Sequence, residues 1–194
     1  KTITNHWNDI AFFQLWRFIN LKYIYIIWNY IKFNKKKNKL VKKKILISTG
    51  GSGGHTIPAI TLYEHLKNDF EIFLTSDKRG AKYINKSVYN YKLIEIPRIS
   101  KNFFKLPYVL LFLIVSFFKS FFFIKKNNIQ VLISTGGYMS FPLCLSAKIL
   151  KIKIYLFEPN TVIGRSNKFF IKFSEKIISY SKNIKNFPEK YKHK

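Results

Sequence analysis

The sequence predicts an α/β fold built on a doubly wound parallel sheet. From about Lys42 onward, short apolar runs that end in turn residues alternate with longer helical stretches, which is the pattern of β/α units. Runs such as Ile45–Ile47 and Val131–Ile133 are continuously apolar, as expected for strands that helices cover on both faces. The motif Leu-Ile-Ser-Thr-Gly-Gly also occurs twice, at 46–51 and 132–137. The chain therefore contains two copies of a strand, glycine turn and helix unit.

The strands and helices can be placed in order along this part of the chain. Apolar runs that end at turn residues predict strands at 45–48, 71–75, 92–96, 131–134, 154–157 and 176–180. The longer segments between them predict helices at 57–67, 106–126, 141–150 and 166–173. Parallel strands need crossover connections of this kind, so the helices are expected to join parallel strands of one sheet.

The apolar segment 106–124 allows two interpretations. Its first thirteen residues contain Ser116 as their one polar member, and nineteen residues are just enough to cross a bilayer. Pro107, however, suits the first turn of a helix, Lys119 lies well inside the segment, and a crossover helix is needed between the flanking strands. We therefore favour a helix packed on the sheet over a spanning helix, with part of its excess of Phe in contact with lipid.

Residues 1–43 form an atypical basic and aromatic leader. They contain no Gly or Pro, and polar residues such as Asn20 and Lys32 interrupt each apolar stretch before it reaches the roughly 20 residues that span a bilayer. One interpretation is an interfacial membrane segment. The interpretation we favour is a non-native leader, read from upstream sequence, with the true start near Leu40 or Val41. The domain itself is then expected at residues 44–194.

The chain is strongly basic, with 35 Lys plus Arg against 9 Asp plus Glu and a formal net charge of +26. Such a charge attracts anionic lipid and phosphate groups. Only four of the cationic residues are Arg, and Lys, Asn, Ile, Phe and Tyr share A/T-rich codons, so genomic base composition is a second explanation. Charge without an RNA- or DNA-binding motif does not predict a nucleic-acid partner.

The sequence predicts neither a disulfide nor a metal centre. Cys144 is the single cysteine, which excludes an intrachain disulfide and a zinc ribbon and fits a reducing cytoplasm. No cluster of residues with metal-ligand spacing is visible, so no metal and no cofactor are expected.

Both copies of the repeat end in a glycine turn ahead of a helix, an arrangement typical of anion binding. In a doubly wound sheet, ligands bind beyond the carboxyl ends of the strands where the strand order reverses, so the two loops are expected to face one cleft. Glycine lets backbone N–H groups approach an anion, and a helix N-terminus adds partial positive charge. The first loop, 50–55, lacks the Gly-Lys-Ser/Thr of a P-loop and the third glycine of the dinucleotide fingerprint. The predicted ligand is a phosphate or a diphosphate.

Three polar side chains near these loops are candidates for chemistry. His55 ends the first loop just ahead of the predicted helix, and an imidazole can accept a proton from a hydroxyl group. Its alternative role is that of a helix-entry residue bonded to the backbone. Glu158 and Asn160 follow the strand at 154–157, and the amide of Asn160 can bond to a sugar hydroxyl or a phosphate. The alternative role of this pair is loop capping and turn formation.

Three motifs in this order resemble the amino-terminal domain of the MurG family, glycosyltransferase family 28. The motifs are Gly51-Ser52-Gly53-Gly54-His55, Gly136-Gly137-Tyr138 with Pro142, and Glu158-Pro159-Asn160 leading to Gly164-Arg165-Ser166-Asn167-Lys168. The resemblance covers about Lys43 to the end of the chain. It implies the N-terminal half of a GT-B fold with two Rossmann-like domains. This chain has room for the first, acceptor-binding domain, and the C-terminal donor domain is missing from it.

The resemblance also implies a reaction. The family transfers N-acetylglucosamine from UDP-N-acetylglucosamine (UDP-GlcNAc) to lipid I, undecaprenyl-diphospho-muramoyl-pentapeptide, to form lipid II. In this inverting transfer the 4-hydroxyl of the acceptor sugar attacks the anomeric carbon of the donor, and UDP leaves. His55 and Glu158 match the catalytic residues proposed to help deprotonate the acceptor. The implied substrate and diphosphate contacts are Gly51, Ser52, Gly53, Gly54, Gly136, Gly137, Tyr138 and Asn160. A fragment of this kind is expected to be inactive alone.

Two departures from the family pattern affect individual contacts. The usual Glu-Gln-Asn is Glu158-Pro159-Asn160 here, and Pro159 removes a backbone donor and a side-chain amide. The first loop has Ser52 where Thr is more usual. A contact made by the family's Gln is therefore not expected in this chain.

The resemblance places the protein on the cytoplasmic face of the bacterial inner membrane, as a peripheral protein. The family binds an anionic membrane surface through a hydrophobic patch ringed by cations. The matching candidates here are Arg98, Lys101, Phe103, Phe104 and Lys105. The alternative interpretation of these five residues is a solvated surface loop.

The alternative function for the whole chain is that of a non-catalytic, membrane-anchoring subunit of a split GT-B glycosyltransferase.

Overall fold

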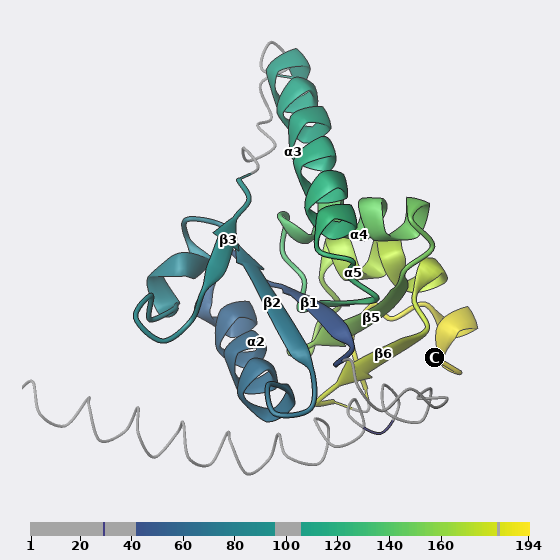
Figure 1. Cartoon of the computed structure of the whole chain (residues 1–194). Helices are drawn as coiled ribbons and strands as arrows, with labels where there is room; N and C mark the ends of the chain where they lie inside the picture. The colour runs from purple at the N-terminus through teal and green to yellow at the C-terminus, as the bar shows by residue number, and fades with distance from the viewer. Residues whose placement is uncertain (1–28, 30–41, 96–105, 182) are drawn as a thin grey trace, which may run out of the picture. The chain divides into compact units, whose positions relative to one another are not determined.

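The computed structural model describes residues 29, 42–95, 106–181 and 183–194 (Figure 1). The chain divides into two compact units, residues 1–40 and 41–194, and the elements below belong to the second unit. Almost all of the predicted leader, 1–43, lies outside the described residues.

Within the described residues, six parallel strands form one sheet in the order β3-β2-β1-β4-β5-β6. The strands are β1 (Lys44–Ser48), β2 (Glu71–Ser76), β3 (Tyr91–Leu93), β4 (Val131–Ser134), β5 (Lys153–Glu158) and β6 (Lys176–Ser179). From β1 the chain winds outward to β3, crosses back to β4 beside β1, and then winds outward in the other direction. The predicted doubly wound parallel sheet is therefore confirmed.

Helices connect most of these strands. They are α2 (Gly53–Leu66), α3 (Leu106–Lys126), α4 (Ser140–Ile149), α5 (Arg165–Phe170) and the short 3₁₀ helices η1 (Gly80–Tyr83), η3 (Ile171–Phe173) and η4 (Glu189–Tyr191). Right-handed crossovers that progress in opposite directions along a sheet place their helices on opposite faces. The helices α3, α4 and α5 accordingly share one face, and α2 covers the other.

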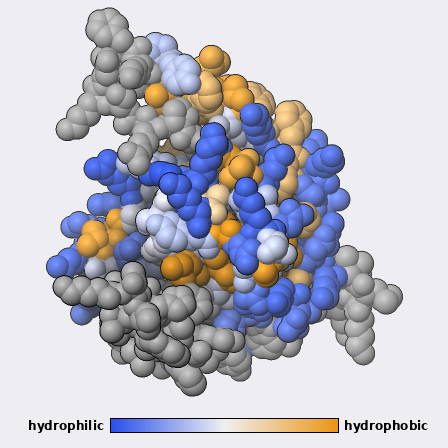
Figure 2. Space-filling model, turned by 90° about the vertical axis from the view of Figure 1, so that its left-hand side faces the viewer, coloured by the Kyte–Doolittle hydropathy of each residue, from blue (hydrophilic) through white to orange (hydrophobic). Residues whose placement is uncertain are grey.

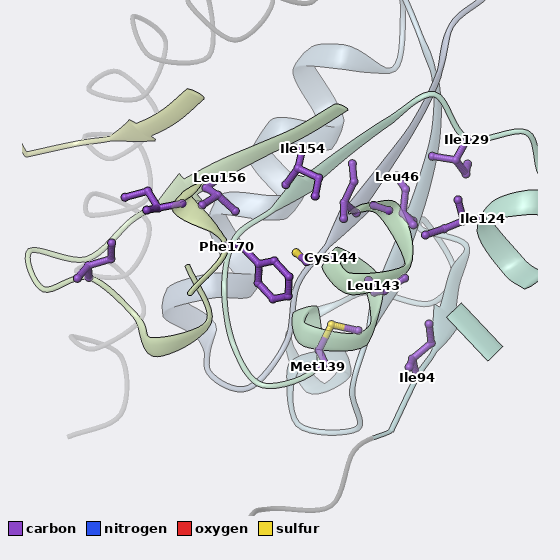
Figure 3. Packing of buried hydrophobic residues seen from close by; sticks show 14 residues of the cluster. Leu46, Ile94, Ile124, Ile129, Met139, Leu143, Cys144, Ile154, Leu156 and Phe170 are labelled. Atoms are coloured by element: carbon purple, nitrogen blue, oxygen red, sulfur yellow. The ribbon is translucent and has the colours of Figure 1, made fainter. Parts of the chain in front are cut away.

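The main core lies between the sheet and the helices α3, α4 and α5, which cover one of its faces (Figure 3). Alternate residues of β1, β4 and β5 contribute Leu46, Leu132, Ile154 and Leu156, and the helices contribute Ile124, Leu143, Cys144, Ala147 and Phe170. Because side chains alternate along a strand, Ile45 and Ile47 lie on the other face, where Leu62 and Leu66 of α2 are also fully buried. Burial on both faces explains the continuously apolar strands.

Three elements differ from the sequence predictions by more than a one-residue shift at an end. Helix α2 begins at Gly53 rather than at 57, because the Ser52 carbonyl oxygen accepts hydrogen bonds from the backbone N–H groups of His55 and Thr56. His55 therefore lies inside the first turn, and the low helix propensity of glycine hides this start in the sequence. The strand expected at 92–96 is Tyr91–Leu93, with residue 96 outside the described part. The helix expected at 166–173 is divided into α5 and η3.

Helix α3 packs on the protein through only part of its surface. Ile124 is buried in the core, Ser116 donates a hydrogen bond to the Glu95 carbonyl oxygen at 2.8 Å, and Ser146 of α4 donates one to the Phe117 carbonyl oxygen at 3.2 Å. By length and composition, Pro107–Lys126 is also apolar enough to cross a membrane, and 22% of its most apolar window is buried. Its exposed apolar side chains are Tyr108, Leu110, Leu111, Phe112, Ile114, Val115, Phe118 and Phe122.

Candidate active site

The two copies of the sequence repeat are neighbours in the sheet and pair with each other in register. Leu46 pairs with Leu132, and Ser48 pairs with Ser134. Beyond the strand ends, Thr135 Oγ1 donates a hydrogen bond to Thr49 Oγ1 at 2.9 Å. Connections leave β1 and β4 in opposite directions, so this is the point where the strand order reverses and where ligands bind in such sheets.

The glycine turns after β1 and β4 have the backbone conformation that their sequence predicts. Gly51, Gly136 and Gly137 have φ values of 87°, 94° and 88°, in the left-handed region that other residues rarely adopt. A Cβ atom on Gly137 would also lie 3.0 Å from the Gly50 carbonyl oxygen, so the two turns pack directly against each other. The predicted pair of adjacent glycine loops is present in the structure.

His55 joins the two loops through its imidazole ring. Its Nδ1 atom lies 2.6 Å from the carbonyl oxygen of Thr135, and because a carbonyl can only accept, Nδ1 carries the proton in this hydrogen bond. In the neutral ring Nε2 then holds the lone pair that can accept a proton. A Cβ atom on Gly136 would lie 3.2 Å from His55 Cε1, so glycine at this position makes room for the ring.

Glu158 lies at the end of β5 and is fully buried. Its Oε1 atom accepts hydrogen bonds from the backbone N–H and the side-chain Nδ2 of Asn160, at 3.2 and 2.9 Å. Its Oε2 atom accepts one from the Gly164 N–H at 2.8 Å and one from Asn167 Nδ2 at 3.0 Å. The carboxylate therefore organises the loop between β5 and α5.

This third loop lies next to the first two. Asn160 is exposed, and its Oδ1 atom lies 3.9 Å from the position that a Cβ atom on Gly54 would take. Asn167 is fully buried, and its Nδ2 atom lies 3.3 Å from the position that a Cβ atom on Gly136 would take. The structure thus brings together residues of the three predicted loops, with Ser52 and Tyr138 exposed at the surface.

Two residues of this site had no role assigned from the sequence. Asn167 lies within the third motif, and the structure shows its hydrogen bond to Glu158, nine residues away. Asp77 lies in no motif. Its Oδ1 atom accepts hydrogen bonds from the backbone N–H groups of Gly51 and Gly80, at 2.8 and 2.7 Å. Its position immediately after β2 was the one available signal, because β2 ends at the same edge of the sheet.

The remaining predictions concern metals and the membrane. Within the described ranges no group of three or more His, Cys, Asp or Glu side chains is placed to hold a metal ion. The predicted membrane contacts Arg98, Lys101, Phe103, Phe104 and Lys105 lie in residues 96–105, outside the described part of the chain.

The N-terminal domain of glycosyltransferase family 28 matches residues 45–179. The chain belongs to glycosyltransferase family 28. The match contains all three loops of the site, from Gly50 to Asn167. The GT-B assignment of the fold and the family resemblance of the motifs are therefore confirmed.

Curated relatives of this family 28 chain are UDP-N-acetylglucosamine--N-acetylmuramyl-(pentapeptide) pyrophosphoryl-undecaprenol N-acetylglucosamine transferases. The protein from Pelagibacter ubique is 57% identical over 154 residues, which are 79% of this chain and 43% of that protein. The one from Rickettsia prowazekii is 37% identical, over 78% of this chain and 39% of that protein. This chain thus spans about two fifths of the length of these relatives.

Solved structures agree with the family 28 fold. The crystal structure of Acinetobacter baumannii MurG superimposes with a TM-score of 0.61 at 20% identity, over 70% of this chain and 40% of that one. A putative UDP-N-acetylglucosamine 2-epimerase from Listeria monocytogenes superimposes with a TM-score of 0.55 at 11% identity, over 72% of this chain and 40% of that one. At these identities the likeness describes the fold alone.

Proposed function

We propose that this chain is the acceptor-binding half of an inverting glycosyltransferase, which transfers N-acetylglucosamine from UDP-GlcNAc to lipid I to form lipid II. The names of the family relatives support this reaction. The structural observation that carries the proposal is the pair of glycine loops at the β1/β4 switch point, with His55 bonded across them to Thr135. A donor domain completes the enzyme.

His55 is the proposed general base. Its Nδ1–H is held by the Thr135 carbonyl oxygen, which leaves Nε2 as the acceptor for the proton of the acceptor 4-hydroxyl. As that oxygen forms its bond to the anomeric carbon, the bond from this carbon to the β-phosphate oxygen breaks, and its electron pair leaves with UDP. Inversion follows because attack and departure occur on opposite faces of the sugar.

The glycine loops are the proposed diphosphate site. Gly51 and Gly136 shape the two loops, because their own N–H groups already donate to Asp77 Oδ1 and Ser134 Oγ. Backbone N–H groups of Gly53 and Gly54 lie at the N-terminus of α2, and that of Gly137 lies in the adjacent turn. Such groups bind anionic oxygens well, since their partial positive charge is fixed before the ligand arrives. Ser52, Tyr138 and Asn160 are exposed around these loops and are the proposed polar contacts to substrate.

Glu158 is proposed to contribute to catalysis indirectly. Its two oxygens already accept hydrogen bonds from Asn160, Gly164 and Asn167, and the carboxylate is buried. Because of these contacts, we propose that Glu158 fixes the loop that carries Asn160 and does not itself take the proton of the acceptor hydroxyl.

The proposed location is the cytoplasmic face of the inner membrane, bound peripherally to anionic lipid. Figure 2 shows hydrophobic side chains gathered over α3 at the top of the view. Beside them, β3 and the C-terminal half of α3 line a groove of about 870 Å³. The groove combines apolar and cationic side chains: Phe122, Phe123, Lys92, Lys119, Lys125 and Lys126. Apolar groups next to lysines suit a surface of anionic lipid headgroups.

The proposal is tested with a chimera in which residues 42–194 replace the matching segment of the Pelagibacter ubique relative, which supplies the donor domain. Membranes containing lipid I are incubated with labelled UDP-GlcNAc, and the label entering lipid II is measured. We expect transfer by the chimera and none by the 194-residue chain alone. A folded, membrane-bound chimera that transfers no label would contradict the proposed reaction and favour the membrane-anchoring subunit.

A further inference from the structure

A fourth segment, between β2 and β3, packs against the first glycine loop. A Cβ atom on Gly80 would lie 2.8 Å from Gly50 Cα and 2.9 Å from Thr56 Oγ1, so the turn that begins η1 is in direct contact with this loop. The ring of Tyr83, at the end of η1, lies 3.1 Å from the position of a Cβ atom on Gly53. The glycine loop is therefore lined on one side by residues 77–83.

Asp77 fixes this arrangement. Its Oδ1 atom accepts hydrogen bonds from the N–H groups of Gly51 and Gly80, one from each of the two segments in contact. Its Oδ2 atom accepts hydrogen bonds from Arg79 Nε and Nη2, both at 3.3 Å. The Asp77 carboxylate thus holds the Arg79 guanidinium beside the first glycine loop, and the same carboxylate bonds to that loop at Gly51.

The position of Arg79 leaves part of its guanidinium available. Its Nη2 atom lies 3.7 Å from the point that a Cβ atom on Gly51 would occupy, and 41% of its side chain is exposed. A guanidinium has five N–H groups, and the contacts with Asp77 use two of them. Within the described part of the chain this side chain forms no further hydrogen bond, so three of its N–H groups have no partner there.

We propose that Arg79 binds a diphosphate at the first glycine loop, as a cationic contact in addition to the backbone N–H groups. This inference rests on the proposed function of that loop. Arginine suits the role because its planar fork can donate to two phosphate oxygens while other N–H groups stay anchored. Lysine is a compact charge and cannot do both at once. The diphosphate belongs either to the lipid-linked acceptor or to UDP-GlcNAc.

The first test measures binding of inorganic pyrophosphate to the full chain by isothermal titration, for the parent, Arg79→Gln and Arg79→Lys. Lys78→Gln is the matched control. Lys78 precedes Arg79 in the chain, but its ammonium group pairs instead with the Glu95 carboxylate, with Nζ 3.0 Å from Oε1. We expect roughly tenfold or greater weakening in Arg79→Gln, since a hydrogen bond between charged groups is worth about a factor of ten or more in affinity. Arg79→Lys is expected to be intermediate, and Lys78→Gln to match the parent.

The outcomes separate this inference from the proposed function. Binding by the parent that persists unchanged in Arg79→Gln, with the fold verified by circular dichroism, overturns the role of Arg79 and leaves the glycine-loop site standing. Absence of pyrophosphate binding by the parent overturns the diphosphate site itself, and the role of Arg79 with it.

The second test identifies which diphosphate is bound. In the chimera, Arg79→Gln is expected to raise KM for one substrate severalfold with a smaller change in kcat. A rise confined to lipid I assigns the acceptor diphosphate, and a rise confined to UDP-GlcNAc assigns the donor. A fall in kcat with both KM values unchanged contradicts a binding role.

Discussion

The Nδ1 atom of His55 lies 2.6 Å from the carbonyl oxygen of Thr135, which connects the first turn of α2 to the glycine turn after β4. The two residues are 80 positions apart in the chain. They meet because β1 and β4 are paired neighbours whose repeat copies align in register. The hydrogen bond selects the ring tautomer in which Nε2 is the free acceptor.

Replacing His55 tests this base directly. In the chimera, His55→Ala is expected to lower kcat by about 10²- to 10⁴-fold, the usual contribution of a general base, with a small effect on KM for UDP-GlcNAc. The matched control is His65→Ala on the same helix, where Nδ1 bonds to the Thr61 carbonyl oxygen within α2. Near-parental transfer by His55→Ala would remove His55 from the chemistry.

Two glycines of the site are expected to respond oppositely to alanine. Gly136→Ala forces a side chain into a φ of 94° and toward His55, so it should lower the free energy of unfolding by about 1 kcal/mol or more. Gly54 lies in helix α2, where a Cβ atom meets only ordinary contacts at 3.6 and 3.9 Å. Gly54→Ala should therefore leave stability unchanged or raise it by about 0.5–1 kcal/mol. Urea unfolding of both variants measures the difference, and equal effects would argue against the backbone conformation described for Gly136.

Glu158→Gln distinguishes a positioning role from a catalytic one. The amide nitrogen of Gln would face N–H donors, so we expect a loss of about 1–3 kcal/mol in unfolding free energy and a reduced kcat. If Glu158 only positions Asn160, the pH profile of kcat in Glu158→Gln should have the same shape as that of the parent. Loss of one limb of that profile would instead assign proton transfer to Glu158. Glu189→Gln, at an exposed ion pair with Lys192, serves as the control.

Cys144 is expected to resist alkylation in the folded chain. Burial between α4 and the sheet raises the pKa of this thiol from 9.0 to about 12, which removes nearly all thiolate at pH 8. Iodoacetamide should therefore react roughly a hundredfold more slowly with the native chain than with the chain in urea. Because the pKa is raised on folding, the associated stability is present below pH 9.0 and declines as pH rises toward about 12. Equal labelling rates in both states would contradict the described core.

The membrane surface of α3 is tested by vesicle flotation of residues 41–194. Phe118→Gln combined with Phe122→Gln removes two exposed apolar side chains and is expected to weaken binding at least roughly tenfold. Vesicles containing phosphatidylglycerol should bind more tightly than neutral vesicles, and added salt should reduce the difference. The matched control is Ile149→Gln, an exposed apolar residue of α4. Unchanged binding by the double variant would exclude this face.

Most of the fold could be predicted because buried parallel strands leave strong local signals. The runs at Ile45, Val131 and Ile154 are apolar on both faces, and the repeat marks two strands that end in equivalent turns. The start of α2 was missed, since Gly53 and Gly54 are poor helix formers that lie in the first turn because the Ser52 carbonyl oxygen accepts hydrogen bonds from His55 and Thr56.

The candidate site was only partly predictable. Glycine loops and a histidine are recognisable in the sequence because their chemistry is local. The contact of Asp77 with Gly51 joins two different segments, and no spacing along the chain indicates it. The hydrogen bond between Asn167 and Glu158 lies within one motif, but the motif does not show which of its side chains meet.

The sequence by itself determined the β/α order, the two glycine loops, the apolar character of α3 and membership of the family, because each is written in residue types and their local spacing. Only the tertiary structure decided that the repeat copies pair with each other, that Thr135 sets the tautomer of His55, and that Glu158 is buried among loop donors. It also brought Arg79 to the first glycine loop. The physical reason is that hydrogen bonds and burial depend on which strand ends meet at one edge of the sheet, and the order β3-β2-β1-β4-β5-β6 exists only once the chain has folded.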